Sequence, residues 1–183
     1  MGALFFRSVP FQYANSVDSV QGALIHGGRF NPPQKLAREL CNLPDGFGYL
    51  YTATNPLTCI LECGHVMRGL AEDRFQSVPV NPTLLVSFKV DADNVLDLRK
   101  PVIQALFGFP TDAFSSVDHR AVINTRGSLT QLKAVGASVY KSGRFSGILT
   151  PSRFADLIPS FCFTFLPREV RYELHDAAGL LRR

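Results

Sequence analysis

The sequence Gly27-Gly28-Arg29-Phe30-Asn31-Pro32-Pro33 opens the stretch that decides the fold, and Leu57-Thr58-Cys59-Ile60-Leu61-Glu62 closes it. Two consecutive glycines allow the backbone to turn sharply and to approach a ligand closely. Arg29 follows them with a planar, permanently charged guanidinium, which suits a phosphate or a diphosphate. An aromatic segment, Tyr-Leu-Tyr-Thr-Ala, lies between the two ends. An anion-binding group, an aromatic face and the carboxylate of Glu62 so close together indicate a nucleotide site.

The aromatic segment Tyr49–Ala53 has the composition of a strand, and a helix is expected after it. Asn55 is a good N-cap and Pro56 is a good first helical residue. We expect this helix to run to about Arg68, where Gly69 can end it.

The expected helix carries an apolar stripe, formed by Leu57, Ile60 and Leu61, that would face the core. Glu62 lies beside this stripe, so partial burial is expected for its carboxylate. A lone glutamate on a helix is usually a solvated surface residue. Only the neighbouring sequence blocks therefore indicate a functional role for Glu62.

The residues between Arg29 and the aromatic strand are expected to form a flap beside the ligand cleft. The pair Pro32-Pro33 can open a short helix over Gln34–Leu40, because proline is tolerated in a first turn. The segment Cys41–Gly48 contains Pro-Asp-Gly and reads as a loop.

Outside this stretch, apolar runs and alternation predict further strands. They are Leu4–Val9, Thr83–Asp91, Val95–Leu98, Gly147–Leu149, Phe161–Leu166 and an edge strand within Arg168–His175. Helices are expected over Lys100–Phe109, around Val117–Asn124, and from Ser128 to Val135 with Gly136 as the stop. Residues 11–26 and 71–82 are expected to lack regular structure. Because strands and helices do not alternate regularly, the class is α+β, and without a Gly-x-Gly-x-x-Gly motif a Rossmann site is not expected.

The length of 183 residues predicts one domain over residues 1–183. Hydrophobic residues make up 46%, as in an ordinary globular chain. No apolar run approaches the ~18 residues of a membrane span, and Arg7 follows the first apolar run instead of preceding it as in a signal peptide. A cytoplasmic protein without membrane contact is therefore expected.

The four cysteines are too few and too scattered for a disulfide scaffold. Cys59, Cys63 and His65 form an alternative zinc set, but a closed zinc site needs four ligands and no second pair stands out. We therefore expect packed, reduced thiols and no metal. No histidine has the context of a nucleophile elbow, so a Ser-His-Asp site is not expected either.

The net charge of +4 comes from 19 basic and 15 acidic residues, which are dispersed along the chain. Nothing resembles a nucleic-acid-binding arm. A modest positive charge suits an anionic small ligand and an acidic protein partner equally well.

Four blocks of the sequence together resemble the RES domain, over roughly residues 3–166. They are Leu4-Phe5-Phe6-Arg7, the Gly-Gly-Arg segment ending in Pro33, the Tyr51 strand with Glu62 in the next helix, and Gly147-Ile148-Leu149-Thr150-Pro151-Ser152-Arg153. The family is named for its arginine, glutamate and serine, which the resemblance assigns to Arg29, Glu62 and Ser152. It consists of bacterial toxins that destroy NAD and are usually paired with an Xre-type antitoxin.

The resemblance implies a fold similar to ADP-ribosyltransferases, with two small β-sheets flanking an NAD cleft and helices at the periphery. NAD would be the substrate, and no further cofactor is implied. Glu62 would stabilise the ribosyl cation, and Arg7 and Arg29 would bind the diphosphate. Tyr51 would offer a flat face to the nicotinamide or the ribose. Ser152 would hydrogen-bond the ribose or a phosphate, or hold a neighbouring side chain in place. The catalytic set is therefore Glu62, Arg29, Tyr51 and Ser152.

Several alternatives stay open within this resemblance. Water as acceptor gives a glycohydrolase, phosphate a phosphorylase, and a macromolecule an ADP-ribosyltransferase, while a non-catalytic binding module is the alternative outside enzymes. An Xre-type antitoxin is the expected partner and would supply any nucleic-acid contact indirectly. A homo-oligomer within such a complex is also left open. The sequence departs from the family pattern at Phe30, where tryptophan is common, and at Thr150, where tyrosine is usual.

Overall fold

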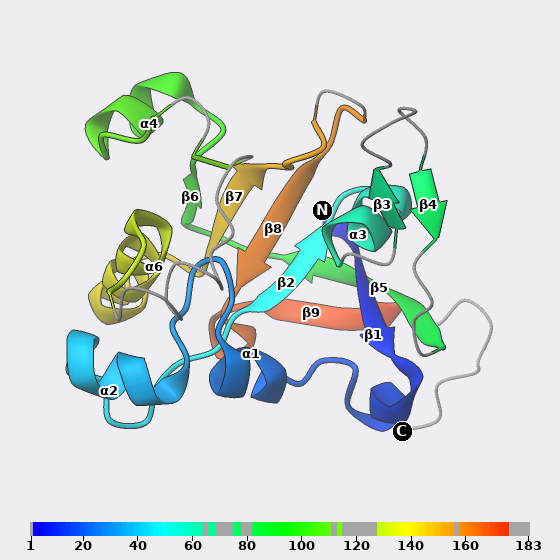
Figure 1. Ribbon diagram of the computed structural model, residues 1–183, viewed down its shortest axis with the longest axis horizontal. Coiled ribbons are helices and arrows are strands. Elements are labelled where there is room, and N and C mark those ends of the chain that lie inside the picture. The colour runs from blue at the N-terminus through cyan, green and yellow to red at the C-terminus, as the bar shows by residue number, and fades with distance from the viewer. Residues whose placement is uncertain are drawn as a thin grey trace.

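The main sheet is organised around strands β1 (Ala3–Pro10) and β2 (Leu50–Ala53), which lie side by side at its middle. The computed structural model describes residues 2–63, 66–68, 75–77, 82–110, 113–114, 128–155 and 158–175. Within these residues, seven strands form one sheet in the order β6-β7-β8-β2-β1-β5-β9, and β3-β4 form a second sheet. Helices lie around the main sheet (Figure 1), so the α+β class is confirmed.

The main sheet consists of two halves that meet at one residue pair. One half contains β1, β5 (Thr83–Asp91) and β9 (Arg171–His175), and β1 pairs with β5 along its whole length. The other half contains β2, β8 (Phe161–Phe165), β7 (Gly147–Pro151) and β6 (Val95–Asp97). Only Phe6 and Ala53 are in register between β1 and β2. The expected two small sheets therefore occur as two joined halves, beside the separate pair β3-β4.

All neighbouring strands of the main sheet are antiparallel except β6 and β7, which are parallel. The alternating sequence of β5 and the apolar runs of β1 and β8 form strands as expected. Both edge strands are short, which limits the unpaired backbone that the sheet offers to other chains.

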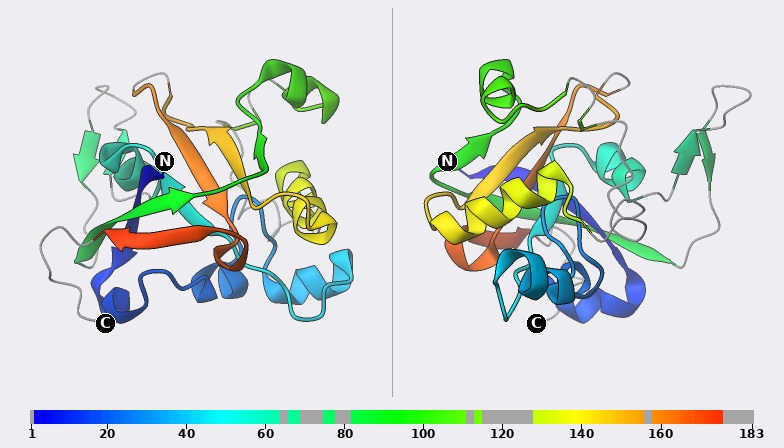
Figure 2. Two further views of the ribbon diagram at one scale, coloured as in Figure 1. Left: turned by 180° about the vertical axis from the view of Figure 1, so that it is seen from behind. Right: turned by 60° about the vertical axis from the view of Figure 1, so that its left-hand side comes forward.

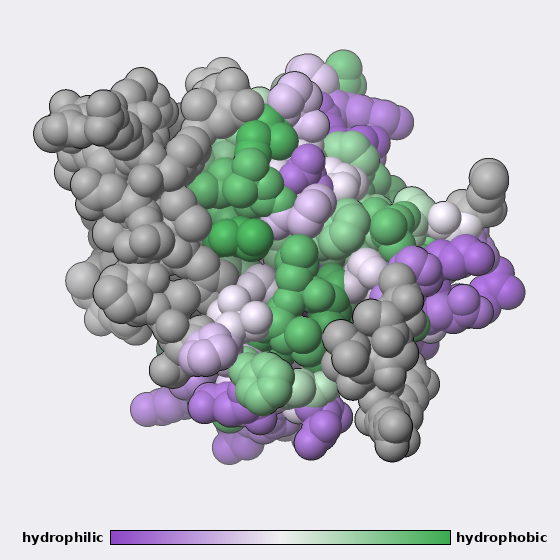
Figure 3. Space-filling model, turned by 90° about the vertical axis from the view of Figure 1, so that its right-hand side faces the viewer, coloured by the Kyte–Doolittle hydropathy of each residue, from purple (hydrophilic) through white to green (hydrophobic). Residues whose placement is uncertain are grey.

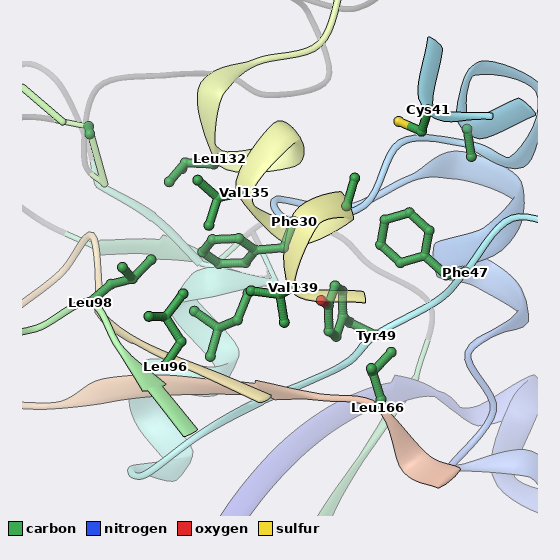
Figure 4. Packing of buried hydrophobic residues seen from close by; sticks show 14 of the residues in the cluster. Phe30, Cys41, Phe47, Tyr49, Leu96, Leu98, Leu132, Val135, Val139 and Leu166 are labelled. Atoms are coloured by element: carbon green, nitrogen blue, oxygen red, sulfur yellow. The ribbon is translucent and has the colours of Figure 1, made fainter. Parts of the chain in front are cut away.

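Two hydrophobic cores hold the sheet. The first lies beneath α6 (Gln131–Ser142) and α2 (Gln34–Cys41), and the second surrounds the phenylalanines of β1, β5 and β8. Figure 4 shows the Phe30 ring between α6 and Leu96 and Leu98. Phe30 is fully buried, so the backbone of its neighbour Arg29 is fixed by the first core.

The segment expected to form a flap is packed into that first core. Ala37 and Cys41 of α2 and Phe47 of the following loop are all buried. The Phe47 ring stacks on Tyr140 of α6 with ring centroids 4.7 Å apart. Because its apolar side chains are taken up in this way, the segment is part of the scaffold.

Helix α6 is longer than expected, because Gly136 lies inside it and does not end it. Thr130 caps its N-terminus, and Gly143 with a φ of 59° ends it. A Cβ at Gly136 would collide with the backbone oxygen of Phe30. This glycine therefore serves close packing of the helix against the Arg29 segment.

Helix α3 (Pro56–Glu62) is shorter than expected, because it ends at Glu62 and not near Arg68. Strand β3 (Val66–Arg68) follows and pairs with β4 (Phe75–Ser77), so these residues form a ladder where a helix was expected. Strand β4 also falls in the segment 71–82 that was expected to be a loop. Figure 2 shows this small sheet standing away from the main one.

The segment 11–26, expected to be irregular, contains the 3-10 helix η1 (Phe11–Ser16) and α1 (Gln21–His26). The remaining elements are α4 (Pro101–Leu106) and the 3-10 helix η2 (Pro167–Glu169). The helical pieces expected around Val117–Asn124 lie outside the described residues. None of the helices in the described ranges has the length and apolar character needed to cross a membrane.

The face that carries α3 and the end of β5 shows apolar surface between polar groups (Figure 3). Exposed large hydrophobic residues on the elements of this side are Leu4, Leu57 and Leu85. Leu57 was expected to face the core, but the buried side of α3 is formed by Thr58, Cys59 and Leu61.

Candidate active site

Glu62 is placed by the short connection between β2 and α3. The Asn55 side chain caps the helix, accepting hydrogen bonds from the backbone N–H of Leu57 at 2.8 Å and of Thr58 at 3.4 Å. The helix therefore begins directly after β2, and its last residue is Glu62. Only 15% of the Glu62 side chain is exposed, so the expected partial burial is confirmed.

Both oxygens of the Glu62 carboxylate are held by other residues of the site. Arg29 Nη2 donates to Oε2 at 2.8 Å, and Ser152 Oγ donates to Oε1 at 2.8 Å. The backbone N–H of Arg153 donates to Oε1 at 2.9 Å. Charge-assisted hydrogen bonds of this kind are short and strong, so the carboxylate has a fixed orientation.

Arg153 brings a second guanidinium to the same carboxylate. Its Nε lies 3.5 Å from Glu62 Oε2, and its Nη2 donates to the backbone oxygen of Leu61 at 3.2 Å. The guanidinium carbon is 4.7 Å from the centre of the Phe154 ring. The Arg153 side chain is 40% exposed, whereas that of Arg29 is 15% exposed. Arg29 is thus the inner arginine and Arg153 the outer one.

Tyr51 holds the loop that presents Arg29. Its hydroxyl accepts from the backbone N–H of Phe30 at 3.0 Å and donates to Asn31 Oδ1 at 2.7 Å. A Cβ at Gly28 would collide with the Tyr51 hydroxyl and ring, so glycine is needed for this approach. The loop also requires Gly27, which has a φ of 75°.

Asn31 links this loop to the preceding helix. Its Nδ2 donates to the backbone oxygen of Ala23 at 2.7 Å, and the side chain is fully buried. The backbone N–H of Gly28 donates to the backbone oxygen of Asn31 at 2.8 Å, which closes the turn around Arg29. Both ends of the buried side-chain amide of Asn31 therefore have hydrogen-bond partners, and these bonds tie the Arg29 loop to α1 and Tyr51.

Strands β7 and β8 form the wall of the site behind Glu62. Cys162 of β8 donates its thiol hydrogen to Glu62 Oε1 at 3.7 Å. Burial, reinforced by the Glu62 charge, raises the pKa of Cys162 to about 12, so this thiol stays neutral and can act as a donor. Thr150 lies opposite Cys162 in the ladder, and within the described part of the chain its buried hydroxyl has no hydrogen-bond partner.

Comparisons with known proteins identify the family and the fold of the chain. The family model described as the RES domain matches residues 4–178 of the chain. The chain belongs to the RES-domain family. The match covers every residue of the Glu62 cluster and both arginines that the sequence assigned to a diphosphate.

Among solved structures, this RES domain is similar to a chain in the crystal structure of the M. tuberculosis MbcT-MbcA toxin-antitoxin complex. The TM-score is 0.63 at 19% sequence identity, covering 96% of this chain and 82% of that chain. The likeness shows a shared fold. A search of curated proteins finds no match.

The structure brings Arg29, Glu62 and Ser152 into direct contact and places Tyr51 against the Arg29 loop. Arg7 is not bonded to this cluster. Its Nη2 donates to the backbone oxygen of Ser19 at 3.0 Å. Its Nη1 is buried without a hydrogen-bond partner among the residues that the structure describes.

Burial lowers the pKa of the Arg7 guanidinium. The groups that oppose this shift are Cys63, Cys59, Asp18 and Tyr172, and Cys63 directly follows Glu62. The diphosphate contact that the resemblance implies for Arg7 stays a prediction.

The sequence reasoning assigned no role to Arg153, Cys162 or Asn31. Arg153 and Asn31 stand directly next to predicted functional residues, so a search of the neighbours in each block would have found them. Cys162 is visible only once β7 and β8 are paired, because its strand reads as an ordinary apolar run.

In the described part of the chain, no three His, Cys, Asp or Glu side chains are grouped so that they could hold a metal ion. Cys59 and Cys63 of the alternative zinc set lie on and after α3, and His65 lies outside the described residues.

Proposed function

We propose that this RES domain is a toxin that destroys NAD by breaking the bond between nicotinamide and ribose, and that an antitoxin restrains it. The observation that carries the proposal is the contact of Glu62 with both Arg29 and Ser152. These are the three residue types that name the family, and they meet at one carboxylate although they come from distant segments.

The chemistry of the bond explains why a carboxylate is the central group. When the bond between the nicotinamide nitrogen and ribose C1′ breaks, its electron pair goes to the nitrogen, so nicotinamide leaves as a neutral molecule without a general acid. The ribose carbon becomes electron-poor. A preorganised negative charge beside it stabilises this state more than it stabilises the substrate. Water then adds to C1′ and releases a proton, which gives ADP-ribose.

The neighbours of Glu62 prepare it for this role. Ser152 and the backbone N–H of Arg153 fix Oε1, and Arg29 fixes Oε2, so the carboxylate needs no reorientation when the cation forms. Arg29 Nε and Nη1 make no hydrogen bond to any described residue, and they remain for a substrate phosphate. Tyr51 contributes by holding the loop of Arg29 and by its ring face.

The first experiment follows NAD and its products with the purified protein alone. Release of nicotinamide and ADP-ribose without any added macromolecule supports hydrolysis, and release of a ribosyl phosphate only when phosphate is added supports phosphorolysis. Label from NAD that appears on a macromolecule supports ADP-ribosyl transfer instead. If NAD stays intact under all three conditions, the hypothesis of an NAD-consuming enzyme is contradicted. The non-catalytic binding module then remains as the alternative.

The partner is proposed from the solved toxin-antitoxin complex of the same fold. An Xre-type antitoxin would insert an acidic segment or a carboxylate near Arg29 and Arg153, where it would imitate a phosphate. Expression of the chain alone should lower cellular NAD and stop growth, and co-expression of the neighbouring gene should relieve both effects. If NAD and the antitoxin compete for the cleft, excess NAD should weaken the complex. A structure of the complex in which the cleft is open would contradict inhibition by obstruction of the cleft.

A further inference from the structure

Two arginines were candidates to join Arg29 in binding a diphosphate, and their surroundings differ. Within the described residues, Arg7 bonds the backbone of Ser19 and makes no hydrogen bond or ion pair with Glu62, although its charge acts on Cys63, the residue after Glu62. Arg153 shares Glu62 with Arg29 and exposes 40% of its side chain. The outer position of Arg153 leaves its guanidinium accessible to a ligand.

We infer that Arg153 binds the diphosphate of the dinucleotide substrate together with Arg29. This inference rests on the proposed function, since it names the residue of the same site that recognises the diphosphate. It also makes the substrate class specific: the site should prefer ribosides that carry a diphosphate over ribosides that carry none.

The charges of the cluster favour an anion at this point. Glu62 carries one negative charge, whereas Arg29 and Arg153 carry one positive charge each, so one positive charge is not compensated within the cluster. A guanidinium matches phosphate oxygens with two parallel N–H donors. The more exposed of the two arginines is Arg153, so the excess charge is accessible to a ligand from solvent.

The hydrogen bonds of Arg153 leave part of its fork free. Nη2 is bound to Leu61 O, and Nε lies at the long distance of 3.5 Å from Glu62. Nη1 has no partner among the residues described by the structure. Phe154 lies under the guanidinium face, so the plane is held while its edge stays open.

The position in the chain also links Arg153 to the reacting bond. Its backbone N–H and the hydroxyl of Ser152 bind the same Glu62 oxygen. A diphosphate held by the Arg153 side chain is therefore kept at a fixed distance from the carboxylate that faces ribose C1′. Anchoring the part of the substrate that does not react orients the part that does.

The test compares Arg153→Gln with the parent and with Arg144→Gln as the matched control. Arg144 is exposed and precedes β7 at the end opposite Ser152. Calorimetry measures the affinity for ADP-ribose, and kinetics measure kcat/KM for NAD and for nicotinamide riboside, which has no phosphate. Arg153→Gln leaves the backbone N–H that binds Glu62 in place.

We expect Arg153→Gln to weaken ADP-ribose binding and to lower kcat/KM for NAD by roughly 10- to 100-fold, the usual range for a charge-assisted hydrogen bond. The kcat/KM for nicotinamide riboside should change less than threefold. Arg153→Lys should recover only part of the loss, because lysine lacks the fork. Arg144→Gln should match the parent with every ligand.

Three results would overturn the inference: parental ADP-ribose affinity in Arg153→Gln, no ADP-ribose binding by the parent at millimolar concentration, or an equal loss with NAD and nicotinamide riboside. Equal loss would mean that Arg153 only supports Glu62. If the parent binds ADP-ribose through Arg153 but never consumes NAD, the inference stands and the proposed function fails.

Discussion

Ser152 donates its hydroxyl hydrogen to Glu62 Oε1 over 2.8 Å, although 90 residues separate the two in sequence. The same hydroxyl accepts the backbone N–H of Phe154 at 3.1 Å. Ser152 is 4% exposed, so it holds Glu62 from within the structure and offers little surface to a ligand. Its main role in the resting molecule is therefore to position the carboxylate.

Glu62→Gln should leave the chain folded and remove most of the activity. The amide lacks the charge that meets the ribosyl cation, so kcat for NAD should fall by roughly 100- to 1000-fold. In either orientation of the new glutamine amide, its NH2 group faces a hydrogen-bond donor of Arg29, Ser152 or Arg153. This clash should lower the free energy of unfolding by about 1–3 kcal/mol. Kinetics and thermal unfolding measure the two effects, with exposed Glu39→Gln as the control. Near-parental turnover in folded Glu62→Gln would falsify the role of the carboxylate.

Arg29→Lys should weaken NAD binding and slow turnover together. A lysine keeps the charge but cannot hold Glu62 Oε2 and a phosphate with one rigid fork. Titration with NAD and steady-state kinetics measure both effects, and Arg38→Lys on the exposed side of α2 is the control. Parental rates at subsaturating NAD would show that the fork is not needed.

Tyr51→Phe should destabilise the chain and reduce activity, since it removes the hydrogen bond from Phe30 N–H and the one to Asn31 Oδ1. Asn31 is fully buried, and an unsatisfied buried group costs about 1–3 kcal/mol. Chemical denaturation measures the loss, and Tyr13→Phe at an exposed site should change nothing. If the two variants behave alike, the hydroxyl does not hold the loop.

Two glycines in helices should respond oppositely to alanine. Gly136→Ala places a Cβ against the Phe30 backbone and should destabilise the chain by roughly 1–3 kcal/mol. It should also reduce activity, because Arg29 directly precedes Phe30. Gly22→Ala meets no atom within 4 Å and should be neutral or stabilise the chain by about 0.5–1 kcal/mol. Denaturation curves of the two variants measure these effects. A stabilised Gly136→Ala variant would show that helix propensity outweighs packing at this position.

The thiols should differ in their rate of alkylation. A hydrogen bond from Cys59 and the charge of Arg7 lower the pKa of Cys63, which is exposed. Burial raises the pKa of Cys162 to about 12. Iodoacetamide at pH 8 should therefore modify Cys63 first and Cys162 far more slowly, as peptide mass spectrometry can measure.

The raised pKa of Cys162 also has a consequence for stability. The native state prefers the neutral thiol, so the stability that this group contributes is complete below pH 9 and is lost as the pH rises toward 12. Cys162→Ala should unfold with a smaller pH dependence across this interval. An unchanged dependence in the variant would assign the alkaline loss of stability to other groups.

Local signals in the sequence predicted the parts of the site that local physics decides. Asn55 and Pro56 start α3 because capping depends on neighbouring residues, and the position of Glu62 follows from that start. The predicted end of α3 near Arg68 was wrong, because Val66–Arg68 form strand β3 and pair with β4. No local signal near Arg68 reveals this pairing. Gly136 was read as a stop because its close contact with Phe30 exists only in the folded chain.

The surroundings of Arg7 show the same limit. Its strand was predicted correctly, but strand prediction does not tell which groups surround a side chain at the middle of a sheet. Ser19, which accepts its hydrogen bond, comes from a segment in which no structure was expected. Cys162 was overlooked because its contact with Glu62 becomes visible only when β7 and β8 are paired.

The strand that leads to Glu62 pairs mainly with a segment that lies far downstream in the sequence. Strand β2 is in register with β1 at one pair only, whereas four of its residues pair with β8, the segment Phe161–Phe165. During translation, β2 therefore has no full partner until the ribosome has passed Phe165. The contacts that fix the Glu62 carboxylate cannot form before Ser152 and Arg153 have been added to the chain, so the candidate site is assembled late in translation compared with the helix that carries Glu62.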